Sequence, residues 1–139
     1  MARLAHLQRT ACAVLALLLL SSCMLSSGLR TTTDTRADAG NTSTSFVGAE
    51  GSEQQFLEIG SPNTRYNVIV TVEVQTGELT LEVLDGASGV VALSVQARPD
   101  VQVTRSGSVV TDERGRLYYR VLTRGARDGS YQILYQRQS

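Results

Sequence analysis

The chain has 139 residues, of which 42% are hydrophobic, and its 13 basic and 13 acidic residues give no formal net charge. This length and composition allow one small domain with its own core. Nucleic-acid binding depends on clustered positive charge, which this balanced composition does not supply. We therefore expect no nucleic-acid partner.

The first 22 residues have the layout of a secretory signal peptide. Arg3 and Arg9 are followed by an apolar stretch at residues 11–20, and no acidic residue lies in this segment. A basic region, a short apolar region and small residues before the cleavage site are typical of such peptides. A membrane-spanning helix needs about 20 apolar residues, so the stretch fits a signal peptide better than an uncleaved anchor.

The run Leu20-Ser21-Ser22-Cys23 resembles the lipobox of a bacterial lipoprotein precursor. The resemblance implies cleavage between Ser22 and Cys23 and attachment of acyl chains, such as palmitate, to Cys23. The protein would then be anchored in the cell envelope. We expect the periplasmic face of the outer membrane in a Gram-negative cell, and the outer face of the cell membrane otherwise. A plain cleaved signal peptide is the alternative.

Removal of residues 1–22 would leave few of the side chains that enzymes commonly use. His6 and Cys12 leave with the signal peptide, and the chain has no lysine. Without Arg3 and Arg9, eleven arginines remain against thirteen acidic residues, a formal charge of −2. Ser-His-Asp and Cys-His catalysis and His/Cys zinc sites are thereby excluded. We expect no catalytic residue, no metal site and no cofactor.

Residues 23–52 are rich in Ser, Thr, Gly, Ala and Asp and contain few large apolar side chains. Segments of this composition bury too little apolar surface to order themselves. We predict a flexible tether of about 30 Å average span between Cys23 and the domain.

Residues 53–139 alternate between apolar and polar side chains, which is typical of half-buried strands. Turns are expected at Thr76-Gly77 and Asp85–Gly89, and Pro99 is expected to end a strand. The predicted strands cover 56–59, 66–75, 79–83, 91–97, 101–104, 109–111, 117–123 and 131–136. This pattern predicts an all-β fold, a seven- to eight-stranded antiparallel β-sandwich of the Ig-like or prealbumin-like kind.

The segment 107–133 resembles part of the prealbumin-like sandwiches, which include carboxypeptidase-regulatory-like and collagen-adhesin B-type domains. The matching positions are Thr111, Asp112, Gly115, Tyr118 or Tyr119, Gly129 and Tyr131. Asp112 is expected to accept hydrogen bonds from amides of its own turn, and Gly115 to supply a positive φ. Many adhesin domains of this kind carry a Lys-Asn isopeptide bond, which a chain without lysine cannot form.

The predicted domain has an acidic first half and an arginine-rich second half. Residues 46–97 hold seven acidic residues and one arginine, whereas residues 98–139 hold eight arginines and four acidic residues. A candidate binding face consists of Arg114, Arg116, Arg120, Arg124, Arg127 and Tyr118. Such a face could hold an anionic polymer or phosphate headgroups. The alternative is that the arginines pair with glutamates of neighbouring strands.

Carboxylates offer two further candidate sites. Glu73 and Glu82 would share a face of a hairpin turned at Thr76-Gly77, and paired carboxylates are what a glycosidase uses. The oxygen ligands of Asp100, Asp112, Glu113 and Asp128 would suit calcium if loops brought them together, although no D-x-D-x-D spacing is present. The alternative for both sets is that these carboxylates are ordinary solvated surface residues without a site.

The sequence thus predicts a lipid-anchored envelope module that binds or scaffolds and is not an enzyme. The membrane is one expected partner, and an envelope protein or an anionic polymer is the other. A carboxylate-based hydrolase of envelope glycans and a ligand-free structural stalk domain are the alternatives.

Overall fold

The computed structural model describes residues 23–36 and 38–139, and every regular element in this part of the chain is a β-strand. The strands are β1 (Leu25–Ser27), β2 (Arg30–Thr35), β3 (Ala39–Glu58), β4 (Arg65–Leu84), β5 (Val91–Ala97), β6 (Val103–Val110) and β7 (Arg116–Arg137). All pairings among them are antiparallel. The predicted all-β antiparallel fold is confirmed.

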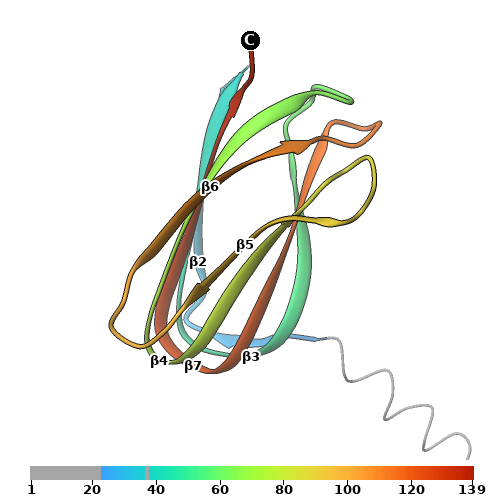
Figure 1. Cartoon of the computed structure of the whole chain (residues 1–139). Coiled ribbons are helices and arrows are strands. Elements are labelled where there is room, and N and C mark those ends of the chain that lie inside the picture. The colour runs from blue at the N-terminus through green and yellow to red at the C-terminus, as the bar shows by residue number, and fades with distance from the viewer. Residues whose placement is uncertain (1–22, 37) are drawn as a thin grey trace, which may run out of the picture.

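Three long strands form the frame of the molecule. β3 and β4 have 20 residues each and β7 has 22, and β7 pairs with β3 on one side and with β4 on the other. Each long strand turns over near its middle, so that one continuous sheet is folded into two layers (Figure 1). The turning points together form the fold line.

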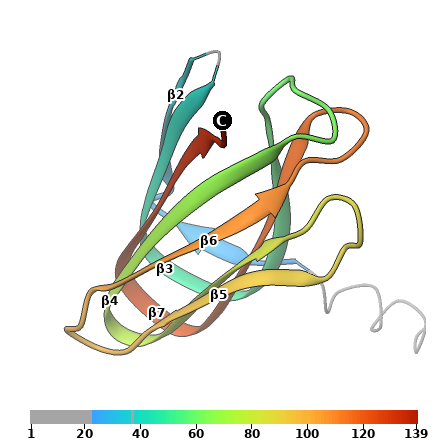
Figure 2. The ribbon, with the colours of Figure 1, turned by 45° about the horizontal axis from the view of Figure 1, so that its top comes forward.

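Each layer contains one half of every long strand. Layer A consists of β2, β6 and residues 39–48, 65–74 and 127–137. Layer B consists of β5 and residues 51–58, 78–84 and 116–124. β1 pairs with residues 48–50 and therefore lies at the fold line. The edge strands β5 and β6 lie side by side along one flank (Figure 2).

Glycines allow the strands to bend at the fold line. The pairing register shifts between Ala49 and Gly51 in β3 and between Thr76 and Glu78 in β4. Gly77 has a φ of 81°, and a Cβ atom on it would collide with the carbonyl oxygen of Gly125 in β7. Only glycine combines a left-handed backbone with this close approach of two strands.

The alternation of β4 changes at the bend, where Gly77 of β4 stands opposite two residues of β7, Gly125 and Ala126. The buried residues have even numbers from Tyr66 to Val74 and odd numbers from Leu79 to Val83. Because successive side chains of a strand point to opposite faces, this change of parity turns the apolar side chains of both halves of β4 to the same side. The concave side of the folded sheet therefore stays apolar across the bend and forms a single core.

The predicted turn at Thr76-Gly77 is wrong, because residues 65–84 form one bent strand. The pairing with β7 continues through the bend, from Val74 opposite Gly129 to Glu78 opposite Arg124. For the same reason, residues 117–136 form one strand instead of the predicted two.

The predicted flexible tether is also wrong, since residues 25–52 contain β1, β2 and the first part of β3. Thr42 and Thr44 are each only 1% exposed. Their hydroxyls lie 3.0 Å from those of Thr33 and Thr31 in β2. Threonine has a high strand propensity, and its cross-strand hydroxyl pairs stabilise a sheet without apolar side chains.

The predicted signal peptide, residues 1–22, lies outside the described residues. Within residues 23–36 and 38–139, no helix is long and apolar enough to cross a membrane.

Candidate binding face

An aromatic pair, one exposed ring and one partly buried ring, lies on the outer face of layer B. Phe56 of β3 and Tyr118 of β7 are register partners, with ring centroids 5.9 Å apart and planes inclined by 54°. The guanidinium carbon of Arg116 lies 4.3 Å from the centroid of the Phe56 ring. The Phe56 side chain points outward from its strand and is 45% exposed. These three residues are termed the aromatic patch below.

The aromatic patch is fixed in place by weak interactions acting together. A tilted aromatic pair contributes about 0.5–1.5 kcal/mol beyond its buried area, and an exposed cation–π contact about 0.5–1 kcal/mol. Two hydrogen-bonded strands hold the backbones of Phe56 and Tyr118. The rings therefore lie on a rigid surface.

Two ion pairs flank the aromatic patch. Arg116 lies 3.2 Å from Glu58 of β3, and Arg120 lies 3.2 Å from Glu82 of β4. In both cases the paired residues are register partners on adjacent strands. Exposed pairs of this kind contribute about 0.2–1 kcal/mol each. These two arginines therefore pair with glutamates of neighbouring strands, which was the alternative to a ligand-binding role.

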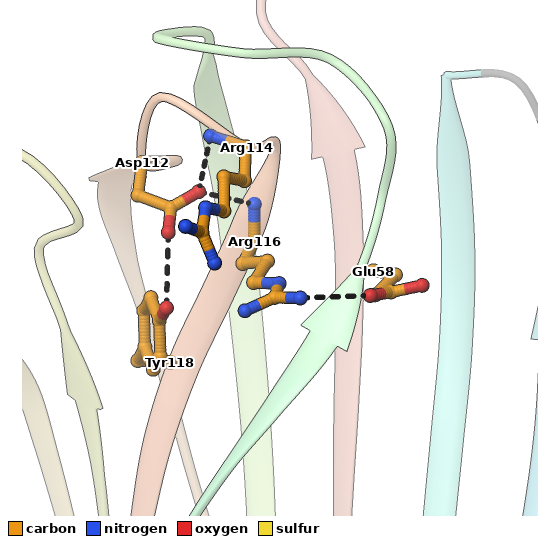
Figure 3. A network of polar contacts seen from close by, with 5 residues as sticks. All are labelled: Glu58, Asp112, Arg114, Arg116 and Tyr118. Carbon is orange, nitrogen blue, oxygen red and sulfur yellow. Dashed lines mark hydrogen bonds and ion pairs between the residues drawn. The ribbon is translucent and has the colours of Figure 1, made fainter.

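The turn before β7 is organised by one carboxylate (Figure 3). Asp112 Oδ1 accepts hydrogen bonds of 2.8 Å from the backbone amides of Arg114 and Arg116. Its Oδ2 accepts a hydrogen bond of 3.0 Å from the Tyr118 hydroxyl. Gly115 has a φ of 75°. The roles expected for Asp112 and Gly115 are confirmed, and the turn is tied directly to the aromatic patch.

The same contacts set the charge of Asp112. Desolvation acts to raise its pKa, but hydrogen bonds from the amides of Arg116 and Arg114 and from the Tyr118 hydroxyl outweigh it. The pKa of Asp112 therefore lies below its usual value of 3.8. The carboxylate stays ionised near neutral pH and keeps the Tyr118 hydroxyl directed toward the turn.

The six residues of the predicted binding face do not lie together. Four of the six lie in the β7 half of layer B and point to its outer face: Arg116, Tyr118, Arg120 and Arg124. The residues that alternate with them, such as Leu117 and Tyr119, are buried. Arg114 belongs to the turn before β7. Arg127 lies beyond the bend, opposite Gly48, and lines a hollow beside β1. That the arginines bind a ligand stays a prediction.

The tyrosines divide into an outer and an inner set. Tyr119 and Tyr131 are buried in the core, with ring centroids 6.2 Å apart, and the Tyr119 hydroxyl donates a hydrogen bond of 2.5 Å to Gln55 Oε1. Burial raises the pKa of both phenols. Tyr118 is the member of the adjacent pair that points outward, on the same face as Arg120.

Glu73 and Glu82, considered as a candidate carboxylate pair, do not lie together. Glu73 lies in layer A, where its carboxylate accepts a hydrogen bond of 2.9 Å from the Ser130 hydroxyl. Glu82 lies in layer B and contacts Arg120. The bend at Gly77 separates the two carboxylates onto opposite outer faces, so they cannot act together on one glycosidic bond.

The acidic residues considered for calcium lie at opposite ends of the sandwich. Asp112 and Glu113 belong to the turn before β7, whereas Asp100 and Asp128 line a hollow near the fold line. The described residues contain no group of three or more His, Cys, Asp or Glu side chains suited to a metal ion. This calcium hypothesis is therefore not supported.

Phe56 is the residue of the aromatic patch that the sequence reasoning did not identify. An apolar residue in a strand is expected to point inward, and here its neighbour Gln55 does so instead. The alternation of β3 reverses at the fold line, where the more buried residues change from even numbers up to Phe46 to odd numbers from Ala49 onward. The glycines at 48 and 51 are the only sequence signal for that reversal.

The chain matches no protein-family model and no curated protein sequence. Several solved structures are similar in shape. A CBM4 structure is 12% identical, with a TM-score of 0.43, over 81% of this chain and 79% of that chain. A carbohydrate-binding module of Cellvibrio mixtus lichenase 5A, solved with cellotriose, is 13% identical, with a TM-score of 0.41, over 86% and 100%.

A protein of the Bacillus endospore appendages, which form disulfide-linked pili, is 13% identical, with a TM-score of 0.44, over 85% of this chain and 97% of that chain. At these identities and TM-scores, no ligand and no residue role carries over from any of the three proteins to this chain.

Proposed function

We propose that the protein is a non-enzymatic binding module of the cell envelope, held to a membrane by acyl chains on Cys23. The lipobox-like run that ends at Cys23 supports the anchor. Cys23 is exposed and is therefore accessible for modification.

The observation that carries the binding role is the aromatic patch. Phe56 is 45% exposed on a rigid strand, beside Tyr118 and under the guanidinium of Arg116. Aromatic residues and arginine are the side chains most enriched at the energetic centres of protein interfaces. A fixed aromatic surface also loses little side-chain entropy on binding.

The partner we propose is another envelope protein. Arg116 and Arg120 are already paired with Glu58 and Glu82, so this face offers mixed charge around an apolar centre. A polar, charged rim around an aromatic centre is the usual composition of a protein interface. An anionic polymer would instead favour several arginines free of carboxylate partners.

Site-specific photo-cross-linking in the native membrane tests this proposal. A photoreactive amino acid replaces Gln54, which is exposed beside the aromatic patch, or Ser45, which is exposed on the outer face of layer A. We expect one discrete protein adduct from position 54 and none from position 45. Equal adducts from both positions would argue against this face.

A matched pair of substitutions then identifies the contact. Phe56→Ala and Ile69→Ala each remove a half-exposed apolar side chain, 45% and 43% exposed, from opposite outer faces. The adduct at position 54 should disappear with Phe56→Ala and persist with Ile69→Ala. If the adduct at position 54 persisted in both variants, the contact would not depend on Phe56. If the protein bound envelope glycan and formed no protein adduct at all, the proposed protein partner would be contradicted.

A further inference from the structure

The chain enters the sandwich immediately after Cys23. β1 begins at residue 25 and pairs with β3, with Leu25 opposite Glu50 and Ser27 opposite Gly48. Met24 is half-buried and packs against the core. The backbone is thus held against the fold line from residue 24 onward, in place of the flexible tether predicted for residues 23–52.

The short connection limits how far the sandwich can be from the anchor. Two extended residues span at most about 7 Å. If the sulfur of Cys23 carries acyl chains, Cys23 lies at the membrane surface, and Leu25 lies within that distance of it. The fold-line end of the molecule is therefore held at the level of the lipid headgroups.

Exposed apolar side chains gather at the corner between β1 and β2. Leu25 is 75% exposed, Val47 54% and Leu29 46%. Gly28, which directly precedes Leu29, lies so near Val47 that a Cβ atom on Gly28 would collide with the Val47 side chain. Leu25 lies at the start of the short strand β1, opposite Glu50. Apolar groups grouped on a surface typically mark a contact with a membrane or another protein. We term Leu25, Leu29 and Val47 the apolar corner.

A hollow of about 340 Å³ adjoins the apolar corner, lined by Leu25, Ala49 and Ala126 together with Glu50 and Arg127. Charges of both signs are present there, so attraction by net charge is weak. The contact with lipid rests on the anchor and on the apolar side chains, the combination of signals that stabilises peripheral attachment.

We infer that the apolar corner rests in the headgroup region of the bilayer that holds the acyl chains of Cys23, and that the turn containing Asp112 faces away from it. This inference depends on the proposed anchor. Tyr118 lies six residues from Arg124 at the fold line, which places the aromatic patch about 20 Å from the membrane. The partner-binding surface is thereby presented at a fixed height and orientation.

Depth-dependent fluorescence quenching of the acylated protein tests the inference. Val47→Cys and Glu113→Cys each introduce one labelling site, because an acylated Cys23 has no free thiol and Cys12 is lost with the signal peptide. Val47 is distant in sequence from Cys23 and is itself part of the apolar corner, whereas Glu113 lies at the opposite end of the sandwich. An environment-sensitive dye is attached to each, and the proteins are reconstituted in phosphatidylethanolamine/phosphatidylglycerol vesicles containing a nitroxide-headgroup lipid.

We expect a blue-shifted emission and loss of fluorescence at position 47, with neither at position 113. Mass spectrometry of the same samples reports the acyl chains. Intact acyl chains with equal quenching at both positions, or with no quenching at position 47, would overturn the orientation and leave the anchor standing. Absence of acyl chains would overturn the anchor and the orientation together.

Discussion

At the scale of single residues, Asp112 connects the turn before β7 with the aromatic patch. It accepts two backbone amide hydrogen bonds and one from the Tyr118 hydroxyl. All three favour the ionised carboxylate. The pKa in the folded chain is below the unfolded value of 3.8, so the stabilising contribution is complete above that pH and is lost as the pH falls through the folded pKa.

Asp112→Asn should therefore lower the melting temperature at neutral pH and have a progressively smaller effect in acid. Thermal unfolding of both proteins between pH 7 and pH 2 measures the difference. The titration of Asp85, whose pKa is also lowered, is common to both proteins and cancels. A difference in melting temperature that stays constant below pH 4 would show that the charge of Asp112 does not stabilise the turn.

Thr111 joins two loops from inside the protein. It is fully buried, its hydroxyl donates a hydrogen bond of 2.6 Å to the carbonyl oxygen of Ser61, and it accepts one of 3.0 Å from the amide of Thr64. Thr111→Val keeps the shape and leaves both backbone groups without this partner, which should cost about 1–3 kcal/mol of unfolding free energy.

The matched control for Thr111→Val is Thr104→Val, which removes an exposed hydroxyl that lies 2.9 Å from that of Thr71. Water replaces an exposed hydrogen bond, so the change should stay within about 0.5 kcal/mol. Urea unfolding measures both. If both variants lost the same unfolding free energy, burial of the hydroxyl would not determine the cost of removing it.

At the scale of elements, the bend in β4 depends on Gly77. Gly77→Ala places a Cβ atom against the backbone of β7 at a positive φ, so both strands must move. Gly89→Ala is the control, because Gly89 has a φ of 71° and open space around its Cβ position. The control should cost about 1–2 kcal/mol from backbone strain alone.

Gly77→Ala should cost clearly more than Gly89→Ala, since it adds the displacement of a neighbouring strand to the same strain. Denaturant unfolding monitored by circular dichroism compares the two. A loss no larger than that of Gly89→Ala would mean that the fold line is not tightly packed at this point.

At the scale of the whole molecule, the folded unit extends well before the boundary predicted at residue 53. A chain shortened to residues 53–139 lacks β1, β2 and residues 39–52 of β3. In the intact protein, residues 39–46 pair with β7 and help to cover Tyr131 and Tyr135, which are 2% and 3% exposed. The shortened chain exposes this part of the core and an unpaired strand edge.

We expect residues 53–139 to aggregate or to lack a cooperative unfolding transition, and residues 23–139 to unfold in one step. Thermal unfolding and size-exclusion chromatography of both chains test this. A monomeric, cooperatively folded 53–139 fragment would restore the tether hypothesis.

Local chemistry explains which features of the fold were predictable. The alternation from Tyr66 to Val74 and the turn from Asp112 to Gly115 depend on residues only a few positions apart, and both were predicted. The adjacency of Tyr118 and Tyr119 in a half-buried strand requires one of the two rings to point outward, and in the structure it is Tyr118. These features follow from the period of a strand and from the conformational freedom of glycine.

The strand-rich fold, the turn before β7 and a candidate anchor at Cys23 could therefore be read from the sequence. Tertiary contacts were needed to show that Gly77 bends a strand instead of ending it, and that residues 30–35 and 39–48 form strands. They also placed Phe56 beside Tyr118, 62 positions later in the chain. The physical reason is that strand pairing and register are non-local: a polar segment becomes a strand when a distant strand supplies its hydrogen bonds, and residue-by-residue patterns contain no record of that partner.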